Sequence, residues 1–173
     1  MKDAYFHIVI YPAHRRFLHF VVSQQHFQFT VLPVKLSMAP RVFTKCMAVM
    51  AASLCRQQIQ VFPYFDDWLI WGRSRDQVQS HVQLARNMFD QLGLLLSVAK
   101  STLVPTQRLE FIGAILDSGL ARALLPEARF QSLASIIRSL QNFPTSTART
   151  CLCLLGHMAS CTYVTRHARL GLR

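Results

Sequence analysis

Acidic residues are scarce in this sequence. Only 8 of its 173 residues are Asp or Glu, against 19 Lys or Arg, so the formal net charge at pH 7 is +11. Such a surplus suggests a polyanionic partner, and nucleic acid is the usual one because each neutralised phosphate releases counterions. A basic protein without such a partner has the same composition, so charge alone leaves both interpretations open.

Features of secreted and membrane proteins are also missing. The 5 cysteines are odd in number and contain no Cys-x-x-Cys pair, which argues against a disulfide framework and favours a reducing, intracellular compartment. No apolar run reaches the roughly 18 residues of a membrane span, so we expect no membrane association. A sequence motif described below begins at Lys2, so we expect no secretion signal before it.

Three metal-ligand side chains are spaced to share one helix face. Cys153, His157 and Cys161 follow one another at four-residue steps. A zinc site would need a fourth ligand, and buried cysteine ordinarily acts as a small hydrophobe, so the second interpretation is favoured.

What is present indicates one α+β domain with a small appendage. Hydrophobic residues make up 51% of the chain, enough for a real core. Strands and helices interleave in the order expected for an antiparallel sheet backed by helices on one face. Two single strands are expected, over 3–11 and 94–97. Three hairpins are expected: 17–23 with 26–31 around Gln24-Gln25, two strands around Asp66-Asp67, and 109–116 with 120–124 turning at Ser118-Gly119.

Helices are predicted where apolar residues recur every three or four positions. One helix begins near Pro40 and another after the possible capping box of Ser74 and Gln77, and the second ends at Gly93. Further helices are expected from Pro126 and over 147–161. The expected apolar stripes are Val42, Phe43, Cys46, Met47, Met50 and Leu54; Val78, Val82, Ala85, Met88, Phe89 and Leu92; and Phe130, Leu133, Ile137 and Leu140.

Two adjacent carboxylates, Asp66 and Asp67, interrupt the apolar and aromatic run of residues 61–71. The pattern predicts a strand, a two-residue turn and a second strand. Neighbouring carboxylates repel each other unless a cation or strong donors hold both ionised, and a divalent metal would do so. A solvated turn is the simpler interpretation, because Asp is common in turns.

Four blocks resemble reverse transcriptases in that family's order. They are KDAYFHI at residues 2–8, LPVKLSMAPRVFTK at 32–45, YFDD at 64–67 and EFIG at 110–113. Together they look most like the polymerase of the tyrosine-recombinase (DIRS-type) retrotransposons. The resemblance covers nearly the whole chain and implies a polymerase palm, here without its fingers.

The resemblance also implies roles for single residues. Asp66 and Asp67 would bind Mg²⁺, or Mn²⁺, for in-line phosphoryl transfer between deoxynucleoside triphosphates and an RNA or DNA primer-template. Asp3 and Ala4 would lie near the incoming nucleotide, and Tyr5 would block a ribose 2′-hydroxyl. The residues alone also allow Tyr5 to be a half-buried strand aromatic.

Two departures from the family pattern stand out. Aligned to the family pattern, the metal-binding Asp of the first block would fall one residue before Met1. Asp3 cannot replace it, because a shift of three residues along a strand moves a side chain to the opposite face. Lys35 occupies a glycine position of the second block, where a positive φ or a close backbone approach is expected. Lys35 could instead meet a phosphate as a point charge.

The rest of the chain supplies further expected contacts. Lys100 matches a family lysine near the triphosphate, or is one more solvated lysine, and Phe111, Ile112 and Gly113 match the hairpin that holds the primer end. The implied division is palm over 1–108, primer-grip hairpin over 109–125 and the start of a helical thumb over 126–173. Phosphate contacts are expected from Arg129, Arg138, Arg149, Arg166 and Arg169.

The resulting interpretation is a fragment of a retrotransposon reverse transcriptase that is inactive, or nearly so, as an isolated chain. Two alternatives stay open. One is a remnant that binds nucleic acid without catalysis, which the retained positive charge supports. The other is the product of a decayed reading frame that leaves apolar faces uncovered and does not fold stably.

Overall fold

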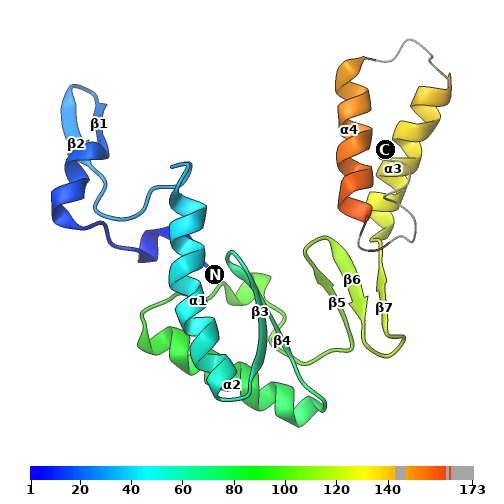
Figure 1. The fold of residues 1–173 in the computed structure, drawn as a ribbon, viewed down its shortest axis with the longest axis horizontal. Helices are drawn as coiled ribbons and strands as arrows, with labels where there is room; N and C mark the ends of the chain where they lie inside the picture. The colour runs from blue at the N-terminus through cyan, green and yellow to red at the C-terminus, as the bar shows by residue number, and fades with distance from the viewer. Residues whose placement is uncertain (143–146, 163, 165–173) are drawn as a thin grey trace. The chain divides into compact units, whose positions relative to one another are not determined.

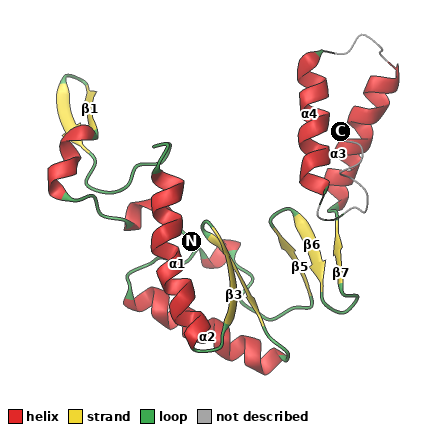
Figure 2. Ribbon diagram, in the orientation of Figure 1, coloured by secondary structure: helices red, strands yellow, loops and turns green. Residues whose placement is uncertain are grey.

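The computed structural model describes residues 1–142, 147–162 and 164. It divides the chain into two compact units, Met1–Pro105 and Thr106–Arg173, each described by itself (Figure 1). Both contain helices together with small antiparallel sheets (Figure 2). The α+β class predicted from the sequence is therefore confirmed, with the described strands in three separate sheets.

Helix α1, Ala39–Arg56, is the central element of the first unit. Pro40 lies in its first turn, where its missing N–H costs no hydrogen bond. The predicted apolar stripe is confirmed at Phe43, Met47, Met50 and Leu54, all of which are buried. With Ala39 and Ala51, this helix supplies six of the thirteen buried residues of the unit's core.

Strands β3, Gln60–Tyr64, and β4, Asp67–Trp71, form an antiparallel hairpin that leads into α2, Arg75–Gln91. The predicted cap is confirmed: the Ser74 hydroxyl accepts the Gln77 backbone N–H at 3.2 Å, and the Gln77 side chain accepts the Arg73 N–H at 2.8 Å. Gly93 ends the helix with φ 69°. Glycine adopts that left-handed conformation without steric cost.

The first unit buries one apolar core. Phe43, Leu32, Leu54 and Ile59 are its largest fully buried side chains. Ala85 and Phe89 of the predicted α2 stripe reach the same core, whereas Leu92 of that stripe is 57% exposed. The core thus joins segments that are far apart in the sequence.

Two predicted strands are wrong. Residues 3–11 contain a 3-10 helix, Ala4–His7, and only Val9 makes a β-bridge, to Val31. No described strand lies beside residues 4–7, so their backbone groups bond locally, as in Phe6 N–H to Asp3 O at 2.9 Å. Residues 94–97 likewise form no ladder, and the Leu95 carbonyl accepts one bond, from Lys2 N–H at 2.8 Å.

The hairpin expected after the first block is confirmed as β1, His19–Val22, and β2, Gln25–Gln28. Its turn is Ser23-Gln24, one residue earlier than predicted, and both residues have positive φ. Two consecutive left-handed residues match the backbone twist of the flanking strands, which favours this turn. A 3-10 helix, Pro12–Phe17, precedes the hairpin.

The second unit contains a three-stranded sheet of β5, Arg108–Phe111, β6, Ala114–Asp117, and β7, Arg122–Leu124. The single strand predicted over 109–116 is wrong because the chain reverses at Ile112-Gly113, where both residues have positive φ. The second reversal, between β6 and β7, lies at the predicted Ser118-Gly119. The Asp117 carboxylate accepts the Leu120 N–H there at 2.9 Å.

Two helices follow the sheet, α3, Glu127–Asn142, and α4, Ala148–Cys161. Both were predicted, and Thr147 caps α4 by accepting the Thr150 N–H at 3.3 Å. No residue of α3 is buried, and Phe130 of its predicted stripe is 57% exposed. Among the described residues, no helix combines the length and apolar character needed to cross a membrane.

Candidate functional site

The two adjacent carboxylates lie at the tip of the β3–β4 hairpin. The strand register pairs Tyr64 with Asp67, so the turn consists of Phe65 and Asp66. The predicted Asp66-Asp67 turn is therefore one residue too late, and Asp67 is the first residue of β4. The carboxylates are neighbours along the chain, but one belongs to the turn and the other to a paired strand position.

Phe65 has φ 50°, in the left-handed region, at the first of the two turn residues. Type II′ turns place glycine at that position, because a side chain there costs roughly 1–2 kcal/mol. The aromatic ring packs edge-on against Tyr64, with 4.9 Å between ring centroids. Local strain of this kind is typical of functional sites that the surrounding structure holds in place.

Both carboxylates are exposed, whereas the residue that follows them is anchored. Trp68 is half-buried, and its ring lies edge-on to Phe89 of α2 at 5.1 Å between centroids. This contact fixes the start of β4 against the helix. The arrangement presents two carboxylates to solvent from the tip of a hairpin that packs against α2 through Trp68.

The first residues of the chain lie against this turn. The Met1 amino group donates to the Asp66 carbonyl at 2.8 Å, while the Lys2 N–H bonds to Leu95. Asp3 follows, exposed and with φ 50°. In residues 1–142, 147–162 and 164, however, no three His, Cys, Asp or Glu side chains are grouped so that they could hold a metal ion. Asp3 thus does not complete a set with Asp66 and Asp67.

Cys153, His157 and Cys161 of α4 are likewise not grouped as metal ligands among the described residues. Cys153 is exposed, His157 is half-buried and Cys161 is 5% exposed. Cys161 is buried as the small-hydrophobe interpretation expects.

Ala4 and Tyr5, expected near the nucleotide, belong mainly to the core. Ala4 is buried, and the Tyr5 ring lies 5.1 Å from that of Phe43 on α1. Tyr5 is therefore the half-buried aromatic that the residues alone allowed, although its strand is absent. A nucleotide contact at either residue stays a prediction.

The two lysines of the expected nucleotide site are both exposed. Lys35 has φ 74°, so the positive φ predicted at this glycine position is confirmed. Lys100 is the last residue of a 3-10 helix, Val98–Lys100. Their contact with phosphates stays a prediction.

The expected primer-grip residues form the end of β5 and the turn after it. Phe111 ends the strand, and Ile112 and Gly113 form the turn, with φ 51° and 71°. Arg129 Nη1 donates to the Gly113 carbonyl at 2.8 Å, and Arg129 Nη2 donates to the Ser160 hydroxyl. One guanidinium therefore ties this turn to α3 and α4.

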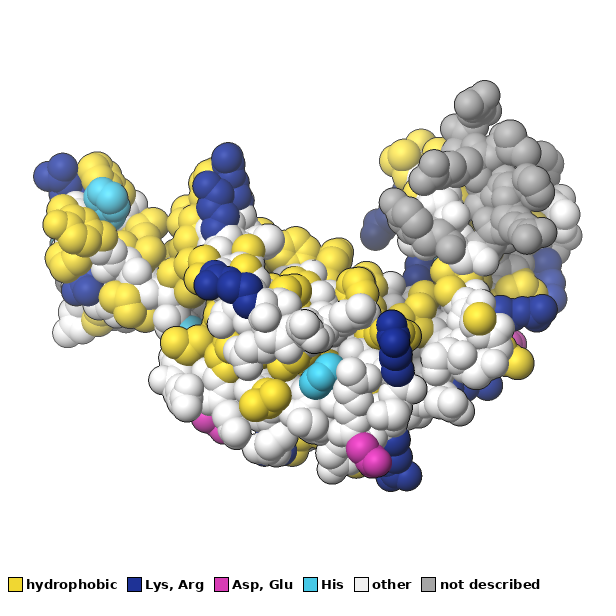
Figure 3. Space-filling model, turned by 60° about the horizontal axis from the view of Figure 1, so that its bottom comes forward, with side chains coloured by type: hydrophobic (Ala, Val, Ile, Leu, Met, Phe, Trp, Pro, Cys, Tyr) yellow, Lys and Arg dark blue, Asp and Glu magenta, His cyan; other side chains and the backbone are white. Residues whose placement is uncertain are grey.

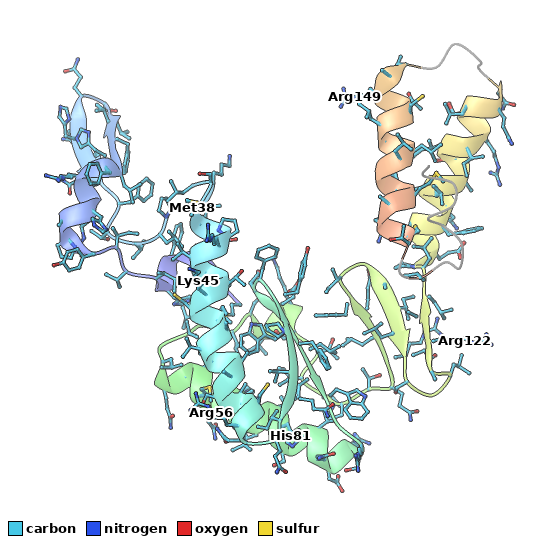
Figure 4. The ribbon with its side chains drawn as sticks, viewed as in Figure 1. Met38, Lys45, Arg56, His81, Arg122 and Arg149 are labelled. Atoms are coloured by element: carbon cyan, nitrogen blue, oxygen red, sulfur yellow. The ribbon has the colours of Figure 1, made fainter. Side chains whose placement is uncertain are left out.

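Arg129 was predicted to contact phosphates; the structure shows it bonded within the second unit, and a phosphate contact at this residue stays a prediction. The sequence carried no signal for this role, because Gly113 and Ser160 are remote from it along the chain. Arg138 and Arg149 are exposed, and Arg166 and Arg169 lie outside the described residues. Lys and Arg side chains occur on both units, as Figures 3 and 4 show.

The donor set at the hairpin tip fits a hard divalent cation in part. Carboxylate oxygens are the ligands that Mg²⁺ and Mn²⁺ prefer, and such ions often take one or two of them together with substrate phosphates. Asp66 and Asp67 are exposed and can supply these oxygens. The tip can therefore hold a cation between the protein and a phosphate, provided that ligands other than Asp66 and Asp67 complete its coordination.

A family model described as reverse transcriptase (RNA-dependent DNA polymerase) matches residues 1–116. Similar curated proteins are the enzymatic polyprotein of Figwort mosaic virus, 26% identical over 121 residues, and the genome polyprotein of Petunia vein clearing virus, 24% over 147 residues. Protein P of Duck hepatitis B virus is 20% identical over 142 residues. These alignments cover 68%, 83% and 82% of the chain but only 17%, 6% and 18% of the relatives.

The left-handed backbone at Lys35 generates a prediction about stability. Lys35→Gly should raise the free energy of unfolding by about 0.5–1 kcal/mol, because relief of the side-chain clash exceeds the extra entropy of the unfolded glycine. Lys45→Gly is the matched control, since Lys45 is an exposed residue inside α1 (Figure 4). That change should lower stability by about 1 kcal/mol. Urea titration of each variant measures both, and a loss of stability in Lys35→Gly would contradict the assigned backbone conformation.

The Arg129 contact generates a second prediction. A Cβ added at Gly113 would lie 2.6 Å from Arg129 Nη1, at a residue whose φ is 71°. Gly113→Ala should therefore lower the free energy of unfolding by about 2 kcal/mol through backbone strain and a displaced hydrogen bond. Gly156→Ala in α4 is the control, because its added Cβ would meet nothing within 4 Å. The control should raise stability by up to about 1 kcal/mol, and equal effects at both glycines would refute the clash.

Proposed function

This chain belongs to the reverse transcriptase (RNA-dependent DNA polymerase) family, and from that premise we propose that it supplies the palm of an enzyme that copies nucleic acid into DNA. The observation that carries the proposal is the pair of exposed carboxylates, Asp66 and Asp67, at the tip of an anchored hairpin inside the matched residues. The chain spans less than a fifth of its curated relatives, so the activity of a whole enzyme is part of the proposal.

In this proposal Asp66 and Asp67 hold Mg²⁺ or Mn²⁺ against the phosphates of a deoxynucleoside triphosphate. When bound, such ions activate the primer 3′-hydroxyl and neutralise charge on the triphosphate. The chain's own contribution is positioning: Trp68 on Phe89 holds the carboxylates at the hairpin tip. Asp3, Ala4, Tyr5, Lys35 and Lys100 would lie near the nucleotide.

The primer end would rest on Phe111, Ile112 and Gly113. Arg129 supports this assignment, because its bond to the Gly113 carbonyl gives the turn a fixed position within the second unit. The proposed division remains a palm over 1–108, a primer-contacting sheet over 109–125 and the start of a helical thumb over 126–173. The primer-contacting part has three strands where a simple hairpin was expected.

We expect the isolated chain to lack polymerase activity. The family resemblance calls for a third carboxylate beside Asp66 and Asp67, and the described residues contain no group of three. Lys35 adds a side chain at a left-handed position where the family has glycine. The four motif blocks together look most like the polymerase of DIRS-type retrotransposons, so such an element is the source we propose.

A second candidate function is binding of nucleic acid without catalysis. The observation that favours it is the net charge of +11 combined with the incomplete carboxylate set among the described residues. It requires affinity that falls steeply with salt and depends little on Mg²⁺ or on Asp66.

Metal binding at the hairpin tip tests the proposed function directly. Added Mn²⁺ should broaden the backbone amide signals of residues 64–68 in nuclear magnetic resonance spectra, because a paramagnetic ion relaxes nearby nuclei. Asp66→Asn with Asp67→Asn should abolish this broadening. Asp76→Asn with Asp90→Asn, which removes the same charge from exposed positions of α2, should leave it intact. Broadening that persists in the first double variant would overturn the metal assignment.

Primer extension tests the expected inactivity. With Mg²⁺, primer-template and nucleotides, the chain should extend no more primer than the Asp66→Asn, Asp67→Asn variant. The physical reason is that two carboxylates from one hairpin would supply too few ligands to hold the metal ions that would neutralise the charge of the transferred phosphoryl group. Extension clearly above that variant would show that the two carboxylates suffice.

A further inference from the structure

The β1–β2 hairpin exposes aromatic side chains. All eight residues of its two strands are exposed. The register places Phe20 opposite Phe27, and their rings stack with centroids 5.5 Å apart and planes inclined by 21°. Phe29 extends the group, 4.7 Å from Phe20. Phe20 and Phe27 are 37% and 41% exposed, and Phe29 is half-buried, so the result is a short aromatic face that is partly open to solvent.

On the opposite face of the hairpin, two histidines contact each other. His19 and His26 stack at 4.9 Å between centroids, and His26 Nδ1 lies 3.0 Å from His19 Nε2. Because successive strand residues point to opposite faces, this pair and the Phe20–Phe27 pair are on different sides. An exposed aromatic face on a two-stranded hairpin is unfavourable alone, which indicates that something covers it.

Charge identifies the kind of partner. No acidic residue occurs between Asp3 and Asp66, while that stretch holds six Lys or Arg: Arg15, Arg16, Lys35, Arg41, Lys45 and Arg56. Two of them, Arg15 and Arg16, lie in the 3-10 helix directly before β1. Figure 3 shows basic and histidine side chains beside hydrophobic ones at the end of the first unit that carries the hairpin. A polyanion complements this surface.

We propose that the aromatic face of Phe20 and Phe27, extended by the half-buried Phe29, binds unpaired bases of a single-stranded nucleic acid by stacking, while the exposed Arg16 contacts its phosphates. Flat rings with cationic neighbours suit this ligand, since every base has a π-face and stacking tolerates any sequence. Arg16 already lies over the Phe17 ring at 4.8 Å, which keeps its guanidinium close to the hairpin. The inference rests on the proposed function in taking a polynucleotide as the partner, but it needs no catalysis.

Binding of a fluorescent oligothymidylate by the full chain tests the stacking. Phe20→Leu with Phe27→Leu should weaken it by about 25-fold or more, because two base–ring stacks are lost and each is worth roughly a factor of 5 to 150. Phe20→Tyr with Phe27→Tyr keeps the rings and should bind as the parent does. Phe130→Leu, at an aromatic residue of α3 that is 57% exposed, should have no effect. A blunt duplex of equal length should bind equally to all of these proteins.

Salt dependence separates stacking from phosphate contacts. Arg16→Gln should reduce the slope of log affinity against log salt by about 0.7, the value for one phosphate of a single strand. The double Leu variant should keep the parent slope. A Phe27→Trp variant adds a direct readout, because stacking on a base quenches its indole fluorescence, whereas Phe130→Trp should not be quenched.

Single-strand affinity that is unchanged in the double Leu variant, or lost equally in the double Tyr variant, would overturn the inference. So would indole fluorescence that stays unquenched in the Phe27→Trp variant, in which case the face would be covered by protein instead of bases. These outcomes are independent of Mn²⁺ broadening at residues 64–68. Failure of the stacking alone leaves the proposed function standing, and failure of the metal binding alone leaves the stacking standing.

Discussion

Burial of one face of α1 is the interaction on which the first unit depends. Phe43, Met47, Met50 and Leu54 lie on that face and are all less than a tenth exposed. Around them pack the β3 strand, the end of α2 and the first residues of the chain. The energetic contribution is large, since each fully buried side chain of this size adds roughly 1.5–3 kcal/mol. The hairpin that presents Asp66 and Asp67 is held in place through this core.

Left-handed backbone residues mark all four motif blocks. Asp3, Lys35, Phe65 and Ile112 have φ values between 50° and 74°, and each lies in a different block. Such residues cost about 1–3 kcal/mol each and persist only where the surrounding structure enforces them. Four more such residues, Ser23, Gln24, Gln58 and Ala121, lie outside the blocks, so left-handed backbone occurs in every block but is not confined to the blocks. Lys35 is the sharpest example, because a long side chain stands where the family pattern has glycine.

The two units organise their functional residues by different means. In the first, apolar packing sets the position of polar groups, as when Trp68 on Phe89 fixes the strand after Asp66. In the second, no residue of α3 is buried, and a polar contact between Arg129 and Gly113 positions the turn instead. A charge-assisted bond to a carbonyl is directional, so it can set the position of a turn that little apolar surface supports.

Local patterns in the sequence determined the α-helices and the place of the carboxylate pair in the chain. The spacing of Phe43, Met47, Met50 and Leu54, the cap at Ser74 and the carboxylate pair were all readable, because each depends on residues close together in the chain. Tertiary structure decided what depends on distant partners. Residues 3–11 alternate as a strand would, yet no described strand pairs with residues 4–7, so they close into a 3-10 helix. Arg129 was assigned to phosphate by its charge, and only the fold brought Gly113 and Ser160 within its reach.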